Sequence, residues 1–402
     1  MIGLIPRDNW EHKFSDLFRG LAGALVPRKQ GSPIYIAGLG DCVPVRSGRA
    51  GLVVAIKALN LPPGAHIGVP LYCCSVVFKA IKTAGCIPRF IDVEPETFCM
   101  STEDLTSKRS QLDAVIAVHM FGNMCDMQGL QEAAQGKPII EDCAQALGSK
   151  IQGRLAGSFG TIAFFSFRSG KYLSVGEGGA LFSNDPALCS RAVQFTDQMV
   201  TPNYADECAH AAKSYIKSIL RSKPLYGIAG YHLWRFLNKK MNLSEKSGVA
   251  LSKVFMSDLT LIRKRLPHLD SAVKKQRNNA DYFSSMLTMA SGMLSPEKPG
   301  AFYNRFHYPI IFPSMKHRDF IANYLLSKKI DTIKYLDDIV DVAAKHFGYA
   351  GDCPTAEQLS KRVLIIPSNY SLRKKDIQHI ARYVNEGWEK IRDRAVVRDD
   401  LR

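Results

Sequence analysis

The sequence predicts an α/β fold with a large domain, in which a mostly parallel sheet lies between helices, and a smaller C-terminal α+β domain. Between about residues 45 and 200, short apolar runs rich in β-branched residues alternate with helix-like stretches. This alternation is typical of βαβ units and of a parallel sheet covered on both faces. The chain has 402 residues and 46% hydrophobic content, which is enough for two domains with a sizeable core.

Each expected element follows from its local pattern. The expected strands are HIGVP (66–70), IPRFIDV (87–93), LDAVIAVHMFG (112–122), KPIIEDCA (137–144), TIAFFSF (161–167) and GGALFSN (178–184). The expected helices between them are GLVVAIKALNL (51–61), SVVFKAIKTAG (75–85) and MQGLQEAAQG (127–136). The last two strands are too close in sequence for a helix between them, so we expect an antiparallel or irregular pair.

Three parts of the chain differ in composition. Residues 1–40 are rich in Gly and Pro and are expected to form an irregular N-terminal arm. Residues 41–250 are assigned to the large domain, with an inserted segment at about 205–250. A helical period returns near residue 252, so residues 251–402 are assigned to a long helix and the small C-terminal domain.

Composition narrows the class of protein. No run of 18 apolar residues is free of charges and turn residues, and the N-terminus has no signal-peptide core, so we expect a cytoplasmic protein. The ten cysteines show no zinc spacing, and we expect reduced thiols and no metal site. Lys and Arg number 53 against 37 Asp and Glu, which favours phosphorylated metabolites, a membrane surface or nucleic acid as partners. Nucleic acid is poorly supported as a partner, because the sequence shows no recognition helix and no aromatic platform for bases.

The residues most informative about chemistry follow two expected strands. IIEDC delivers Asp142 to the carboxyl end of a strand, where open α/β sheets bind their ligands. FSFRSGK ends a second strand at Ser166 and places Lys171 in a turn containing Gly170. Pyridoxal phosphate requires such parts: a lysine amine to bond to it and a carboxylate beside its ring nitrogen.

A phosphate group also needs a binding site, and a helix N-terminus is a favourable one. The segment VRSGRAGLVVAIKAL (45–59) predicts a strand end followed by a helix that begins near Gly48, Arg49 and Ala50. Arg49 adds a positive charge at that position.

Together these segments resemble the DegT/DnrJ family of sugar aminotransferases, which are fold-type I pyridoxal-phosphate enzymes. The resemblance covers roughly 43–200 and 253–392 and rests on the combination of EDCAQ with FSF, Lys171 and GEGG. It implies that Lys171 is the Schiff-base lysine and proton shuttle, that Asp142 pairs with the ring nitrogen, and that Gln145 contacts the side of the cofactor's 3-hydroxyl. It also implies that Ser166 and the turn at Gly48, Arg49 and Ala50 bind the phosphate, in a homodimer with shared active sites.

Several positions depart from the family pattern. Arg49 replaces the usual Thr, and Lys253 stands near the place of an Asn that commonly reaches the neighbouring subunit's phosphate. The position of the aromatic residue that often stacks on the cofactor ring is Cys74, and Tyr72 is the neighbouring candidate. The first forty residues lack the family's usual N-terminal helix signature.

Two histidines and the inserted segment have alternative interpretations. His119 and His307 lie in strand-like runs, where a structural role is favoured over a catalytic one. The 205–250 segment mixes aromatic and basic residues, so it is either a peripheral contact with an anionic membrane or an inserted helix pair packed on the dimer. The packed helix pair is the favoured interpretation.

By resemblance, the expected activity is transfer of an amino group from L-glutamate to a nucleotide-linked keto sugar, for polysaccharide, glycan or antibiotic sugar biosynthesis. The basic surplus suits a pyrophosphate-containing substrate. A pyridoxal-phosphate sugar dehydratase is an alternative, but those enzymes replace the lysine with histidine, and Lys171 argues against it. A non-catalytic, cofactor-binding regulatory protein is the alternative from another class.

Overall fold

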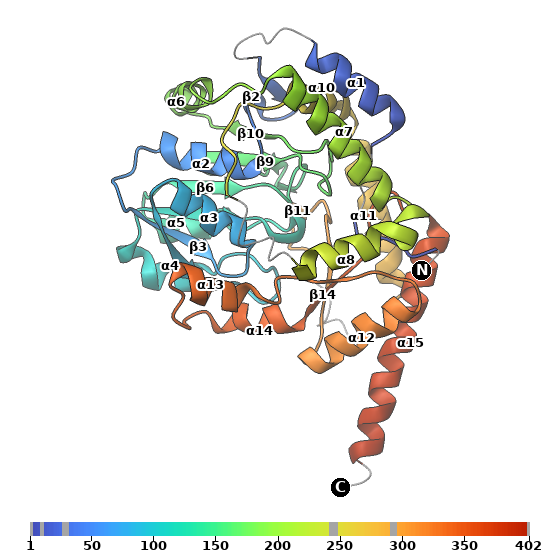
Figure 1. The fold of residues 1–402 in the computed structure, drawn as a ribbon. Helices are drawn as coiled ribbons and strands as arrows, with labels where there is room; N and C mark the ends of the chain where they lie inside the picture. Colours follow the sequence, from blue (N-terminus) through green and yellow to red (C-terminus); the bar gives the residue numbers. More distant parts are fainter. Residues whose placement is uncertain (1–2, 9–11, 26–31, 241–247, 290–295, 400–402) are drawn as a thin grey trace.

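The computed structural model describes residues 3–8, 12–25, 32–240, 248–289 and 296–399. An eight-stranded sheet forms the centre of the larger part (Figure 1). Its strands, in spatial order, are β1 (Ile34–Ile36), β2 (Gly40–Val45), β10 (Gly179–Phe182), β9 (Ile162–Ser166), β6 (Ile139–Asp142), β5 (Ala114–Val118), β3 (His66–Pro70) and β4 (Ile87–Ile91). The five strands from β9 to β4 are parallel, as predicted for the centre of the sheet.

The pair formed by β9 and β10 is antiparallel, which confirms the expectation from their short connection. Strand β10 also pairs antiparallel with β2, and β2 pairs antiparallel with β1, so one end of the sheet is antiparallel. The helices of this part are α2 (Gly48–Ala58), α3 (Ser75–Thr83), α4 (Thr102–Lys108), α5 (Met127–Ala134) and α6 (Pro186–Asp197).

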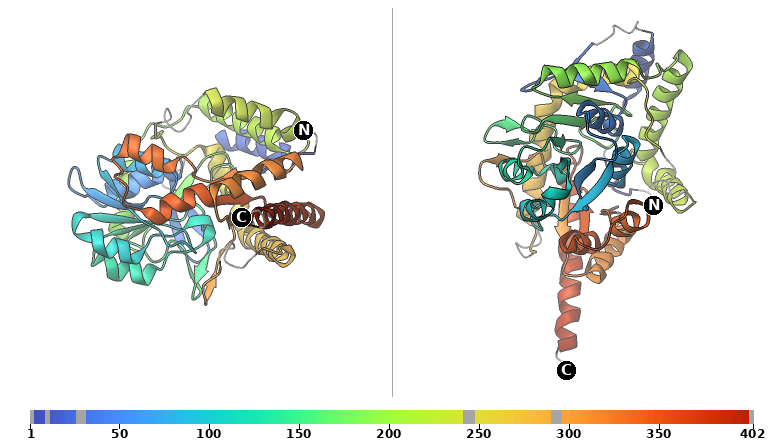
Figure 2. Two further views of the ribbon diagram at one scale, coloured as in Figure 1. Left: turned by 90° about the horizontal axis from the view of Figure 1, so that it is seen from below. Right: turned by 90° about the vertical axis from the view of Figure 1, so that its left-hand side faces the viewer.

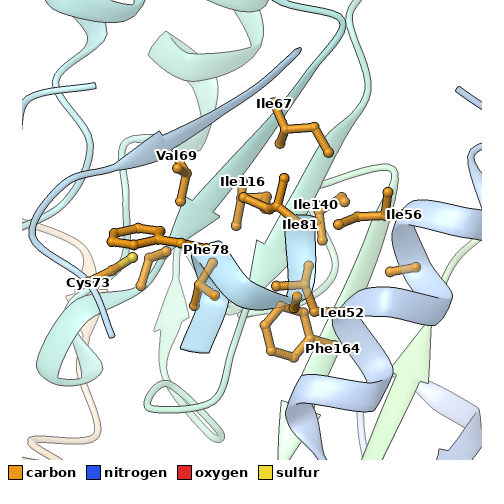
Figure 3. Close-up of a cluster of buried hydrophobic side chains, with 14 of the residues drawn as sticks. Leu52, Ile56, Ile67, Val69, Cys73, Phe78, Ile81, Ile116, Ile140 and Phe164 are labelled. Carbon is orange, nitrogen blue, oxygen red and sulfur yellow. The ribbon is translucent and has the colours of Figure 1, made fainter. Parts of the chain in front are cut away.

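Apolar side chains fill the space between the sheet and its helices. On one face, Leu52 and Ile56 of α2 and Phe78 of α3 pack against Ile116 and Ile140 of the central strands (Figure 3). These parallel strands are buried on both sides, which explains why their sequences are continuously apolar rather than alternating. The site residues at the strand ends are therefore held by a rigid, close-packed scaffold.

The first forty residues are not irregular throughout, and this expectation was wrong. They contain helix α1 (Phe14–Ala24) and strand β1. The carboxylate of Asp16 accepts the N–H of Lys13 at the helix start and is bonded by Lys264 and Arg265. These long-range ion pairs stabilise a helix whose start lacks the usual Ser, Thr, Asp or Asn cap.

The inserted segment is helical: α7 (Tyr204–Arg221) leads into a π-helical turn, η3 (Tyr226–Gly230), and then α8 (Tyr231–Lys240). Figure 1 shows α7 beside α1 and α8 crossing the front of the molecule. The expected long helix near residues 252–290 is divided into α10 (Met256–Arg265) and α11 (Leu269–Met286) by a short 3₁₀ turn at Leu266–His268, which contains Pro267.

The C-terminal part contains a three-stranded antiparallel sheet with helices, as expected for a small α+β unit. Its elements are β12 (Tyr308–Ile311), β13 (Ile333–Lys334), β14 (Val363–Ile366), α12 (Met315–Ser327), α13 (Ile339–Phe347), α14 (Pro354–Arg362) and α15 (Lys374–Asp399). A second small sheet joins β7 (Lys150–Ile151), β8 (Arg154–Leu155) and β11 (Ala301–Phe302). Helix α15 projects from the body in Figure 1 and in the right view of Figure 2. Among the described residues, none of the helices is sufficiently long and apolar to cross a membrane.

Candidate active site

The two predicted catalytic residues lie at the carboxyl ends of neighbouring parallel strands. Asp142 ends β6, and Lys171 follows β9 in a turn whose geometry depends on Gly170, which has φ of +90°. The pKa values of both groups are influenced by their mutual proximity. The fold therefore brings together an amine and a carboxyl group that are 29 residues apart in sequence.

Burial determines the ionisation of Lys171. Desolvation, together with the nearby positive charge of Arg168, lowers the pKa of its amine to about 8, although the charge of Asp142 opposes the shift. The Nζ atom lies 4.8 Å from the centre of the Phe306 ring. At pH 7 about one-tenth of this lysine is therefore uncharged, and the uncharged amine is the form that acts as a nucleophile or a base.

The carboxyl group of Asp142 is buried and oriented by the backbone. Burial raises its pKa, and the N–H of Ala144, which donates to Oδ1 at 2.9 Å, acts in the opposite direction together with Lys171. Such a carboxyl group is suited to share a proton with a cationic ring nitrogen placed against it, because few water molecules compete with the ring nitrogen for its hydrogen bonds.

The predicted phosphate corner lies at the start of α2. Ser47 caps this helix by accepting the N–H of Ala50 at 3.3 Å, and Gly48 and Arg49 form its first turn. Ser166, at the end of β9, packs directly on Gly48: a Cβ at position 48 would lie 2.7 Å from the Cβ of Ser166. The glycine thus allows the Ser166 side chain to lie against the helix N-terminus, where the sequence predicted the phosphate-binding turn.

Gln145 is buried beside the site. Its Oε1 accepts the N–H of Phe121 at 3.2 Å, and its Nε2 donates to the hydroxyl of Tyr335 at 3.1 Å. Tyr335 follows β13 in the C-terminal part, so this pair joins the two parts of the chain at the site. The local sequence around Tyr335 had not indicated that this residue contacts Gln145.

The two candidates for stacking on the cofactor ring have different surroundings. Tyr72 is fully buried, donates its hydroxyl hydrogen to the carbonyl of Tyr335 at 3.2 Å and stacks on Phe98. Cys74, at the start of α3, is exposed and is close enough to Lys171 to affect its pKa. This arrangement favours Cys74 over Tyr72 as the residue that faces the ring.

The two histidines differ. His119 is completely buried and its Nε2 lies 2.9 Å from Glu141, while its Nδ1 accepts the N–H of Cys125. This agrees with the structural role favoured from the sequence. Although His119, Glu141 and Cys143 are close together, Glu141 is already bonded by three backbone N–H groups. The cluster is therefore satisfied without a metal ion.

His307, in contrast, lines the cavity that contains Lys171. Burial and the charge of Lys171 lower its pKa to about 3, so it is neutral throughout the physiological range. The structural interpretation favoured from the sequence therefore omitted its place in the site.

The N-terminal segment supplies further cavity residues that the sequence did not reveal. Arg7 and Asp8 line the cavity together with Lys171. Asp8 is 3.5 Å from Arg221 of α7, which connects the inserted segment to the edge of the site. Lys253, which stands near the place of the family's Asn, forms an ion pair with Asp197 at 3.7 Å.

A family model described as the DegT/DnrJ/EryC1/StrS aminotransferase family matches residues 35–385. The chain belongs to this family. It is a pyridoxal-phosphate-dependent aminotransferase, and the lysine, carboxylate and phosphate corner described above fit that cofactor.

Two relatives indicate the kind of substrate used within the family. The chain is 26% identical to GDP-perosamine synthase of Escherichia coli O157:H7, over 85% of this chain and 84% of the relative. It is 28% identical to a UDP-N-acetyl-3-dehydro-alpha-D-glucosamine 3-aminotransferase of Acidithiobacillus ferrooxidans, over 86% and 84%. The crystal structure of the aminotransferase TlmJ from Streptoalloteichus hindustanus has the same fold, with a TM-score of 0.77, 21% identity and coverage of 97% and 100%.

Proposed function

We propose that this aminotransferase converts a nucleotide-linked keto sugar to an amino sugar, with L-glutamate as the amino donor, as a cytoplasmic homodimer. The observation that carries this proposal is the arrangement at the carboxyl ends of β6 and β9, where an amine of lowered pKa, Lys171, is near the buried carboxyl group of Asp142, and Ser166 packs on the N-terminus of α2. Support for the substrate class comes from the two relatives named for GDP- and UDP-linked sugars, each of which matches more than four-fifths of this chain.

The charges around the cavity favour an anionic substrate. Arg168 is exposed beside Lys171, and α7 adds Arg221, which pairs with Asp8, and Lys217. Burial and the neighbouring cations Lys213 and Arg221 lower the pKa of Lys217, a sign that positive charge is concentrated here. A pyrophosphate group would relieve this repulsion.

The roles of the protein groups follow from their positions. Bound pyridoxal phosphate supplies an electron sink for the charge left when the donor's α-carbon loses its proton. Lys171 Nζ accepts this proton and returns it, because burial keeps a fraction of the amine neutral. Asp142 holds a proton on the ring nitrogen, and Ser166 with the first N–H groups of α2 holds the phosphate. His307 and Phe306 form the wall beside the lysine and limit its hydration.

The direct test is production of 2-oxoglutarate from L-glutamate in the presence of each candidate nucleotide-linked keto sugar. We expect turnover only when the protein, the donor and one such sugar are all present. Lys171→Ala should abolish turnover, and Asp142→Asn should reduce cofactor affinity and slow both halves of the reaction by at least about 100-fold. Lys137→Ala, on the opposite end of β6 from the site, is the matched lysine control and should behave as the wild type.

The visible absorption spectrum tests the identity of the amino donor separately from that of the sugar acceptor. The visible band of the cofactor-loaded protein should bleach on addition of L-glutamate alone and should be unaffected in Lys171→Ala. If a different amino acid bleaches the band and L-glutamate does not, the protein is still an aminotransferase but its amino donor is that other amino acid. Turnover by Lys171→Ala would contradict the lysine assignment. Bleaching by L-glutamate, combined with no turnover of any of the nucleotide-linked keto sugars, would contradict the substrate class.

A further inference from the structure

The inserted segment presents an uncovered apolar face on one side of the molecule. Four side chains of the η3–α8 region form this face, which we call the α8 face: Leu225 (37% exposed), Ile228 (51%), Leu233 (45%) and Phe236 (59%). Large apolar side chains scattered singly are ordinary on protein surfaces, but several on one helical unit are characteristic of a binding surface.

The opposite side of the same unit is fixed to the body of the protein. Tyr226 is buried and donates its hydroxyl to Asp331 at 2.5 Å, and Tyr231 is buried next to it. Trp234 lies against the guanidinium of Arg7, 4.2 Å from its ring centre. The α8 face is therefore presented outward by packing on its reverse side, and Figure 2 (right) shows α7 and α8 along the outer edge of the molecule.

The segment that carries this face is basic in sequence. The sequence has no Asp or Glu between Glu207 and Glu245, but it has seven Lys and Arg residues there. Of these, Lys213 on α7 and Arg235 on α8 are exposed, whereas Arg221 and Lys223 form ion pairs with Asp8 and Asp376. An amphipathic helix with apolar side chains on one side and flanking cations fits a lipid surface with negative headgroups.

We propose that the α8 face docks this enzyme on an anionic phospholipid membrane. Leu233 and Phe236 enter the boundary between headgroups and acyl chains, and Lys213 and Arg235 contact the lipid phosphates. Since the described helices include none that could cross a bilayer, the association is peripheral and reversible. The proposal is independent of the sugar substrate, because it concerns a surface outside the Lys171 cavity.

The charge pattern disfavours two other occupants. A second copy of the chain in a twofold contact would place the same cations opposite one another, without acidic partners in the segment. Nucleic acid would match the cations but not the apolar side chains that occupy the centre of the face. A lipid surface satisfies both features.

The test is flotation of the cofactor-loaded full chain with vesicles. We expect binding to phosphatidylcholine mixed with phosphatidylglycerol to exceed binding to phosphatidylcholine alone by about tenfold at low salt, and to decrease as salt is added. The double variant Leu233→Glu with Phe236→Glu should lose at least about tenfold in vesicle binding. Lys213→Gln with Arg235→Gln should weaken binding to the anionic vesicles only.

Met315→Glu, at an apolar position on α12 that is 48% exposed, is the matched control and should bind like the wild type. The cofactor spectrum of each variant checks that the fold is kept. Absence of wild-type binding to anionic vesicles, or unchanged binding by the double Glu variant, would overturn the proposal. Sedimentation that shows the double Glu variant to be a monomer and the wild type a dimer would assign the face to a second copy instead.

Discussion

Desolvation shifts the pKa values of the two principal site residues in opposite directions, and in both it disfavours the charged form. It favours the neutral amine at Lys171 and the protonated carboxyl at Asp142, so the protein withholds from both groups the water that would keep them charged. Each then depends on its neighbours for charge compensation. This explains how an ordinary lysine acquires nucleophilic and basic character near neutral pH.

This burial predicts a pH dependence for cofactor loading. The rate at which the cofactor-free protein takes up pyridoxal phosphate should rise about tenfold per pH unit at low pH, because the neutral amine is the reactive form. The rate should level off above the pKa of about 8. Stopped-flow absorbance at a series of pH values measures the rate of uptake. An inflection near the ordinary lysine value of 10.5 would show that Lys171 is not desolvated as described.

Cys74 should be protected by the cofactor. Its thiol is exposed beside the site, whereas Cys189 and Cys208 are partly exposed elsewhere. Bound pyridoxal phosphate should slow alkylation of Cys74 by at least about tenfold by covering it, and peptide mass spectrometry measures the labelling. Labelling of Cys208 serves as the internal control and should not change. Equal labelling of Cys74 with and without cofactor would place it away from the ring.

At the scale of single elements, β6 shows how one strand serves both structure and chemistry. Glu141 and Asp142 are adjacent, so their side chains point to opposite faces of the sheet. Asp142 faces the site, while Glu141 accepts the N–H groups of Gly157, Phe159 and Gly160 at 2.5–2.8 Å. The second acid therefore fixes the loop that leads into β9, the strand before Lys171.

Glu141→Gln should lower the free energy of unfolding by about 3 kcal/mol, because an amide cannot compensate His119 and three N–H donors. Urea denaturation measures this, with Glu389→Gln on the exposed side of α15 as the control. Burial opposes ionisation of Glu141, but His119 and the N–H groups outweigh it and lower its pKa. Its stabilisation is thus present above the ordinary value of 4.5 and lost as the pH falls below its lowered pKa. A decrease in the free energy of unfolding of less than about 0.5 kcal/mol in Glu141→Gln would contradict this role.

On the scale of the whole molecule, the N-terminal segment joins parts that are distant in sequence. Ile5 forms an isolated bridge with Ile330, and Arg7 contacts Asp331 at 2.6 Å and 2.8 Å. Tyr226 of the inserted segment bonds to the same carboxylate. Asp331 therefore links the N-terminus, the insertion and the C-terminal part next to the Lys171 cavity.

Asp331→Asn should lower the free energy of unfolding by roughly 3 kcal/mol, because it leaves the partly buried Arg7 without its counter-charge. Thermal and urea unfolding measure the loss. Asp341→Asn, at an exposed position of α13, is the control and should change stability by no more than about 0.5 kcal/mol. If both variants unfold alike, the carboxylate does not link these segments.

The parts of the molecule that could be predicted depend on local signals. The central strands and α2 were recognised because their apolar runs and the turn at Gly48, Arg49 and Ala50 are features of adjacent residues. Helix α1 was missed because its start is stabilised by Lys264 and Arg265, more than two hundred residues away. Tyr335 and Asp8 were missed for the same reason, since only tertiary packing brings Tyr335 to Gln145 and Asp8 to the Lys171 cavity.

The sequence by itself determined the fold class, the family and the pairing of Lys171 with Asp142, because strand periodicity and turn chemistry are encoded within short segments. The tertiary structure decided the ionisation of these groups, the exposure of Cys74 and burial of Tyr72, and the outward α8 face. Burial and exposure arise from contacts between segments far apart in the chain. No local pattern specifies them, and they become defined only when the chain is packed.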